Sequence, residues 1–178
     1  MSTQIKGNDT STFGGNVDVT GNVITDAPAF SAYMSANQTQ SHNVFTKVQF
    51  NTEQYDTNSC YDNATNYRFT PTTAGYYCIK SVLSYLTPST GSSDVYYRNV
   101  IYKNGSGFVE TELASSNYGN GRRLTVSTIS DIYMNGSTDY LEVYSYHYDY
   151  STGAATTIVA DLGGPKKSLF QGTLVRAV

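Results

Sequence analysis

The chain has 178 residues and a formal net charge of −3, with 11 Lys and Arg residues against 14 Asp and Glu. This length suits a single domain that needs no stabilising disulfide bonds, and the shortage of positive charge argues against nucleic acid as a partner. The residues from Met1 to Asn8 contain no apolar stretch of the kind found in signal peptides or membrane spans. We therefore expect no membrane contact, and a chain that stays in the cytoplasm where it is made unless lysis releases it.

The first 26 residues differ from the rest of the chain. The run from Gly15 to Thr20 is followed at once by a second copy from Gly21 to Asp26, with Gly, Asn and Val in register. A segment so short and so poor in large side chains cannot bury enough surface to order itself alone. We predict that residues 1–26 form an extended docking arm, which uses the apolar side chains of Val17, Val19, Val23 and Ile24, and that residues 27–178 form the folded head.

The pattern of the head is that of β-strands. Tyrosine occurs 17 times and tryptophan is absent, which together with abundant Thr, Ser and Val is typical of sheets. Apolar and polar residues alternate with a period of two, which predicts strands with two different faces. One predicted strand face contains Val44, Thr46, Val48 and Phe50, and another contains Tyr77, Ile79, Ser81, Leu83 and Tyr85.

Turn residues separate these strands. Asn104-Gly105 and Asn135-Gly136 both accept the positive φ that tight hairpins require, so each is predicted to join two strands. Gly163-Gly164-Pro165 interrupts the chain before a last predicted strand over Ser168 to Val178. Short strands with regular turns favour a sandwich or a barrel.

Several segments, taken in order, carry a family resemblance. They are Pro28 to Tyr33, Val44 to Val48, Tyr67 to Ile79, Val100 to Gly105 and Ser168 to Val175. From Pro28 onward the chain resembles the head domain of the C1q and tumour-necrosis-factor superfamily, in the form found in bacteriophage structural proteins. The signature positions are Phe30, Phe69, Gly75, Tyr77, Phe170 and Gly172, with Ile79 in place of a further aromatic residue.

The resemblance implies an all-β, ten-stranded antiparallel jelly-roll sandwich that assembles as a homotrimer. It also implies that the three N-termini lie near the threefold axis. At the signature positions the aromatic residues are expected to supply core bulk. Gly75 is expected to permit a tight entry into a strand, and Gly172 the close approach of another element.

A tyrosine-rich segment is the candidate functional surface. Period-two alternation places Tyr140, Tyr144, Tyr146, Tyr148 and Tyr150 on one strand face. We predict that Tyr144, Tyr146 and Tyr148 lie in the trimer interface while Leu141 and Val143 enter the core. Two alternatives remain open at this point: an aromatic platform for a sugar ring, and ordinary exposed tyrosines.

Catalytic and metal sites are not expected. The two histidines, His42 and His147, stand in no recognisable catalytic context, and no calcium-loop pattern joins Asp56, Asp62, Asp131 and Asp139. The cysteines, Cys60 and Cys78, are read as free thiols, although a disulfide between them is possible. Arg122-Arg123 is read as a solvated turn, with docking to an acidic partner as the alternative. We expect no enzyme activity, no bound cofactor and no assignable metal, with calcium as the one metal left open.

Two functions follow from the resemblance and the arm. The first is a virion surface protein of a bacteriophage, a homotrimer whose arm binds capsid or tail proteins and which acts as capsid decoration (cement) or as a head fibre. The second is the receptor-binding tip of a tail fibre or spike that recognises a host-surface glycan or protein. Either protein would be assembled in the host cytoplasm and located on the virion.

Overall fold

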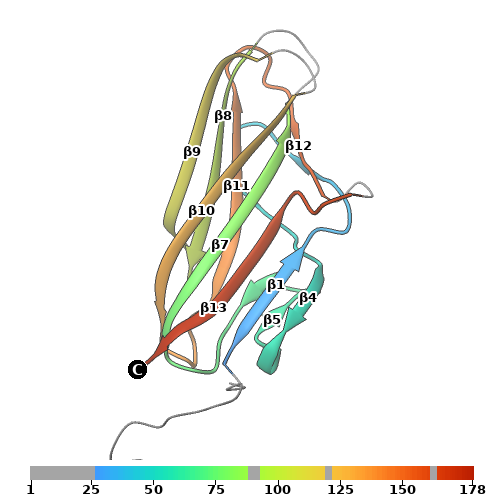
Figure 1. Cartoon of the computed structure of the whole chain (residues 1–178). Coiled ribbons are helices and arrows are strands. Elements are labelled where there is room, and N and C mark those ends of the chain that lie inside the picture. The colour runs from blue at the N-terminus through green and yellow to red at the C-terminus, as the bar shows by residue number, and fades with distance from the viewer. Residues whose placement is uncertain (1–26, 88–92, 119–121, 161–163) are drawn as a thin grey trace, which may run out of the picture.

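The fold is a sandwich of two antiparallel sheets, seen in a computed structural model (Figure 1). The structure describes residues 27–87, 93–118, 122–160 and 164–178. The predicted arm residues, Val17, Val19, Val23 and Ile24, therefore lie outside the described part of the chain. No helix among the described residues has the length and apolarity needed to cross a bilayer.

Each sheet is named here after its central strand. The β7 sheet contains β1 (Ala29–Tyr33), β2 (Gln38–Gln40), β4 (Thr52–Asp56), β7 (Gly75–Leu86), β10 (Arg123–Met134), β12 (Thr156–Ile158) and β13 (Leu169–Ala177). The β11 sheet contains β3 (Thr46–Lys47), β5 (Tyr61–Asp62), β6 (Arg68–Phe69), β8 (Ser93–Lys103), β9 (Ser106–Tyr118) and β11 (Leu141–Asp149). A short 3-10 helix, η1 (Thr57–Ser59), follows β4.

The order of the strands is that of a jelly roll. In the β7 sheet, β7 pairs with β10 on one side and with β13 on the other, and β13 in turn pairs with β1. In the β11 sheet, β11 pairs with β8, and β8 pairs with β9. The predicted all-β antiparallel sandwich is confirmed. The described residues form 13 strands rather than the expected ten, and five of these strands span only two or three residues.

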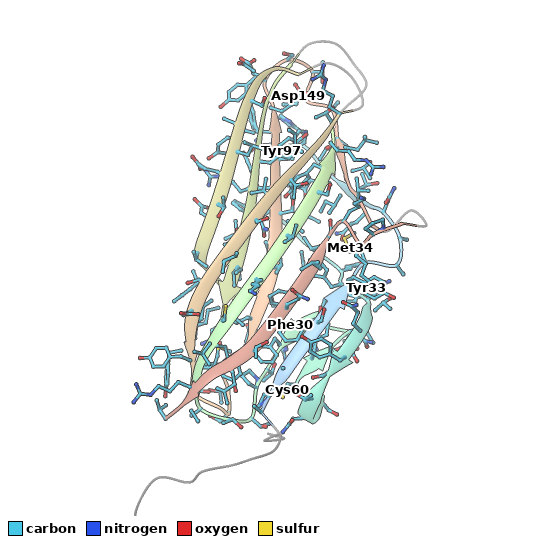
Figure 2. All side chains as sticks on the ribbon, viewed as in Figure 1. Phe30, Tyr33, Met34, Cys60, Tyr97 and Asp149 are labelled. Atoms are coloured by element: carbon cyan, nitrogen blue, oxygen red, sulfur yellow. The ribbon has the colours of Figure 1, made fainter. Side chains whose placement is uncertain are left out.

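Aromatic side chains fill the space between the sheets at one end of the sandwich. Phe30 has no exposed surface, and its ring centroid lies 4.8 Å from that of Tyr61, 4.5 Å from that of Phe69 and 4.8 Å from that of Phe170. Tyr77 joins the cluster, 5.4 Å from Phe69. The four aromatic signature positions therefore belong to one core cluster, and Figure 2 marks its place by the label of Phe30.

The two signature glycines leave space for their neighbours. A Cβ at Gly172 would lie 2.6 Å from the Phe30 ring and 2.8 Å from Ile79, and a Cβ at Gly75 would lie 2.4 Å from the carbonyl oxygen of Arg176. The close approach expected at Gly172 is present. At Gly75 the reason differs from the one expected, because this glycine allows the backbone of β13 to pass closely.

Buried polar groups also join the sheets. Asn99 of β8 donates to the carbonyl oxygens of Ser81 on β7 (2.9 Å) and Val126 on β10 (3.0 Å). The Tyr85 hydroxyl of β7 donates to the carbonyl oxygen of Arg98 (3.1 Å). Because a buried polar group without a partner costs about 1–3 kcal/mol, these contacts favour one alignment of the two sheets.

The strand predicted over 44–50 is largely wrong. Only Thr46–Lys47 forms a strand, and Val44 is 50% exposed instead of facing the core. The Gln40 side chain donates to the carbonyl oxygen of Val44 (2.7 Å), which holds this residue in a loop. Val48 and Phe50 are buried as expected.

Of the two predicted hairpin turns, one is confirmed. Asn104 and Gly105 have φ values of 53° and 80° and form the two-residue turn between β8 and β9. The tight hairpin predicted at Asn135-Gly136 is wrong, because residues 135–140 lead from β10 in one sheet to β11 in the other. Gly136 still has a positive φ of 70°. The predicted last strand is β13, while the predicted break at 163–165 falls partly outside the described residues.

Candidate functional site

The predicted two faces of the tyrosine-rich strand are present in β11. Leu141, Val143, Ser145 and His147 face the core and have no exposed surface. Tyr144, Tyr146 and Tyr148 alternate with them, are half-buried, and lie on the outer face of the β11 sheet. Tyr150, just after the strand, is 68% exposed.

The neighbouring strand β8 extends this aromatic face. The antiparallel register sets Tyr146 opposite Arg98 and Tyr148 opposite Tyr96. The ring of Phe45, from the loop before β3, lies 4.8 Å from that of Tyr146. Farther along, Tyr102 stacks on Tyr144 with ring centroids 4.1 Å apart and an interplanar angle of 25°.

These side chains surround a hollow in the protein surface, here called the tyrosine groove. Its volume is about 760 Å³, which falls within the range of about 300–1,000 Å³ typical of small-molecule sites. It is lined by Asn43 and Phe45 before β3, Tyr96 and Arg98 of β8, and Tyr146, Tyr148 and Tyr150 of β11 and its end.

Arg98 is the one lining residue with a formal charge, and acidic side chains offset it. Its guanidinium lies 3.7 Å from the Glu110 carboxylate and 3.7 Å from that of Glu112, both on β9. Its Nε donates to the Tyr96 hydroxyl (2.8 Å), which in turn donates to Glu112. Partial burial and this hydrogen bond to Glu112 both raise the pKa of Tyr96, so the phenol stays protonated at neutral pH.

Asn43 has an unusual backbone conformation that fixes one wall of the groove. Its φ of 57° lies in the left-handed region, which asparagine tolerates better than most residues. Its backbone N–H donates to the carbonyl oxygen of His147 (2.8 Å), and its side-chain oxygen accepts from the Tyr146 hydroxyl (2.7 Å). The loop that carries Asn43 and Phe45 is thereby attached to β11.

His147 lies directly beneath the groove. Its ring stacks on Tyr97 with centroids 4.8 Å apart, its Nε2 lies 3.1 Å from the carbonyl oxygen of Ala154, and its Nδ1 has no hydrogen-bond partner among the described residues. Burial lowers the pKa of His147 below 6.5, so the folded protein holds a neutral imidazole. At neutral pH this buried neutral ring packs in the core against Tyr97.

This burial predicts a stability loss in mild acid. Below about pH 6.5 the unfolded chain takes up a proton at His147 while the folded chain does not, so the free energy of unfolding falls as the pH decreases toward the lower folded pKa. Each unit of pKa difference corresponds to about 1.4 kcal/mol. Urea unfolding followed by circular dichroism at about pH 7.5 and about pH 5.5 measures the slope.

The variant His147→Asn should lose most of that slope, whatever its stability at neutral pH. Asp62→Asn is the matched control. Backbone N–H donors lower the pKa of Asp62 to about 2, so this carboxylate affects stability as the pH falls below 3.8, outside the histidine window. An unchanged slope in His147→Asn would show that another group titrates.

The candidate metal ligands do not gather. The Asp56 carboxylate accepts from the backbone N–H groups of Cys60 and Tyr61, and that of Asp139 pairs with Lys103 at 2.9 Å. Asp131 lies on the outer face of β10. Throughout the described residues, no three His, Cys, Asp or Glu side chains lie close enough together to hold a metal ion.

The remaining sequence predictions concern cysteines and a basic pair. Cys60 and Cys78 are both free thiols, which confirms the first reading and excludes the disulfide. Arg122 is exposed as expected of a turn, whereas Arg123 is the first residue of β10.

Comparison with solved structures identifies the fold. The structure is similar to that of Eiger TNF from S. frugiperda, with a TM-score of 0.58 over 85% of this chain and 93% of that chain, at 13% sequence identity. The chain has a TNF-like jelly-roll fold. The sequence matches no protein-family model and no curated protein.

Four of the seven residues that line the groove were not predicted from the sequence. Asn43, Phe45, Tyr96 and Arg98 were not identified, because they come from two segments about 50 residues apart that meet on β11 only in the fold. The alternation of Tyr96 and Arg98 with the buried Val95, Tyr97 and Asn99 was the one usable signal.

Proposed function

We propose that this chain is a non-enzymatic, homotrimeric virion surface protein of a bacteriophage, acting as capsid decoration or as a head fibre. Residues 1–26 anchor it to capsid or tail proteins, and assembly takes place in the host cytoplasm. Its partners are proteins, and in the second role they also include sugars. Neither nucleic acid nor membrane is among the proposed partners. Together with the phage-type resemblance and the repeat in the arm, the TNF-like fold supports this proposal.

The observation that carries the trimer is a set of exposed apolar and aromatic side chains on the outer face of the β7 sheet, which they share with Lys80 and Asp131. Ile129 is 62% exposed and Val175 is 61% exposed, and Tyr76 and Tyr133 are exposed on the same sheet with ring centroids 5.5 Å apart. The register sets Tyr133 opposite Tyr76, so these side chains share one face. Branched aliphatic and aromatic residues exposed together typically mark a surface that another protein covers. The occupants proposed here are two further copies of the chain.

The tyrosines predicted for the interface lie on the other sheet. Tyr144, Tyr146 and Tyr148 belong to the outer face of the β11 sheet, where they line the groove or lie beside it. They remain a second candidate for the contact between subunits. Their half-buried state leaves less apolar surface uncovered than Ile129 and Val175 do.

The tyrosine groove favours a second role, that of a receptor-binding tip for a host-surface glycan or protein. β1 begins at the end of the sandwich that contains Phe30 and Cys60, whereas Asp149, next to the groove, lies at the opposite end (Figure 2). A head anchored through residues that precede β1 would therefore present the groove outward. Three grooves in one trimer would also bind a dense glycan surface with avidity.

The proposal predicts a mass and a copy number. Sedimentation equilibrium of the full chain at micromolar concentration should give three times the 19.5 kDa chain mass. Quantitative mass spectrometry of purified virions then distinguishes the two roles. On the order of hundreds of copies indicates decoration, and a few to some tens indicates a tail appendage, because the copy number follows the number of attachment sites on the particle. A well-folded monomer, or absence of the chain from particles, would overturn the proposal.

A further inference from the structure

We infer that the tyrosine groove is a binding site for an uncharged carbohydrate, whose pyranose rings stack on its tyrosine rings. This inference deepens the receptor-binding role and depends on neither the trimer nor the virion. It rests on three features of the groove: its aromatic rings, its hydrogen-bonding groups and its charge balance.

The aromatic rings line the groove on several sides. Tyr148 and Tyr150 meet edge to face with centroids 4.7 Å apart, and Tyr96 lies at 81° to Tyr146 with centroids 6.3 Å apart. Rings set at such angles present faces in more than one direction. The electron-rich face of an aromatic ring attracts positively polarised hydrogen atoms, and the C–H groups on one face of a pyranose are of this kind. A bent oligosaccharide can therefore contact several of these rings at once.

Hydrogen-bonding groups stand beside the rings. The Tyr148 and Tyr150 hydroxyls and the Asn43 amide nitrogen have no hydrogen-bond partner among the described residues, and all three residues line the groove. Sugar hydroxyls both donate and accept, so they match tyrosine hydroxyls and an amide. A purely apolar ligand would leave these groups without partners, at a cost of about 1–3 kcal/mol for each group that it buries.

The charge balance selects against ionic ligands. The Arg98 guanidinium lies over the Tyr96 ring (5.0 Å) and the Tyr146 ring (5.6 Å), where it repels a cation. Glu110 and Glu112, on β9 beside the groove, lie 3.7 Å from this guanidinium and offset its charge, so the groove has no uncompensated positive charge to hold a sialic or uronic acid. Lys47, a further cation on this sheet, pairs with Glu142 at 2.7 Å. The ligand class that remains is a neutral sugar.

The groove is held in shape before any ligand binds. Its β8 and β11 walls are joined along an uninterrupted register from Leu141 to Asp149, and the Asn43 loop is bonded to His147 and Tyr146. Arg98 is fixed by its hydrogen bond to Tyr96. Sites built on paired strands bind with little loss of conformational entropy, which weakly binding sugars require.

The test measures binding of the full chain to a glycan array. One half of the array carries neutral hexoses and N-acetylhexosamines, and the other half carries the same cores ending in sialic or uronic acid. We expect binding to at least one neutral glycan and none to its acidic counterpart, with soluble ligands then measured by calorimetry. Absence of binding to every neutral glycan at millimolar concentration would overturn the inference, as would preference for the acidic forms.

Two single variants locate the site, and one double variant tests whether the acidic side chains beside it exclude acidic ligands. Tyr148→Ala should weaken the affinity at least about tenfold, whereas Phe108→Ala, an aromatic residue 55% exposed on β9 outside the groove, should leave it unchanged. The double variant Glu110→Gln/Glu112→Gln removes the two negative charges that offset Arg98. This double variant should still bind the neutral ligand and should gain affinity for the acidic form.

If Tyr148→Ala binds like the wild type with an unchanged circular dichroism spectrum, the groove is not the site. Sedimentation and virion copy number are read separately, so failure here leaves the trimer proposal intact.

Discussion

Phe30→Ala is expected to lower the free energy of unfolding by about 3–5 kcal/mol, the usual cost of removing a fully buried aromatic ring. Phe30 contacts Tyr61, Phe69 and Phe170 at centroid distances between 4.5 and 4.8 Å, so its removal leaves a cavity where both sheets meet. Urea unfolding followed by circular dichroism measures the change. The control is Phe108→Ala, which removes the same ring from a position 55% exposed and should change the free energy by no more than about 0.5 kcal/mol.

A double-mutant cycle with Gly172 tests the geometry of this cluster. Gly172→Ala alone forces a Cβ to within 2.6 Å of the Phe30 ring, and crowding of this kind costs about 1–3 kcal/mol. In the Phe30→Ala background the Cβ has room on that side, so the second substitution should cost clearly less. Equal costs in both backgrounds would show that Ile79, 2.8 Å from the same position, dominates the crowding.

Ile129→Lys is expected to convert the proposed trimer to a monomer without unfolding the subunit. Ile129 is 62% exposed in the single chain, so a lysine there is solvated, but in the proposed interface it would bury an ammonium group opposite Lys80. Sedimentation equilibrium should show the mass fall to that of one chain, with an unchanged circular dichroism spectrum.

The matched variant for the alternative face is Tyr144→Ser/Tyr146→Ser. If the trimer forms through the β7 sheet, this double variant should keep the mass of three chains. If instead it dissociates while Ile129→Lys stays trimeric, the subunits meet through the tyrosines of the β11 sheet. Sedimentation equilibrium of these two variants therefore shows which of the two faces forms the contact between subunits.

Local sequence patterns correctly predicted which residues face the core in β7 and β11, but they did not predict every strand correctly. Alternation in β11 and β7 was read correctly because both strands are long and have one face in the core, which imposes period two. The same pattern at Val44 to Phe50 failed because the Gln40 side chain binds the backbone there, a contact that alternation does not reveal. Asn104-Gly105 and Asn135-Gly136 look alike in sequence, yet only the first joins two neighbouring strands.

The sequence by itself determined the all-β class and the division of β11 into a buried and a tyrosine face, and the family resemblance located the aromatic and glycine positions of the core. The first two features depend on β-propensity and period-two alternation, which act over a few residues. The tertiary structure decided which sheet each strand joins. It thereby decided that Asn43, Arg98 and Tyr146 share one groove and that Glu110 and Glu112 offset its positive charge. Those relations arise from pairing between distant segments, where the free energy of packing the whole sandwich, rather than any local preference, selects the partners.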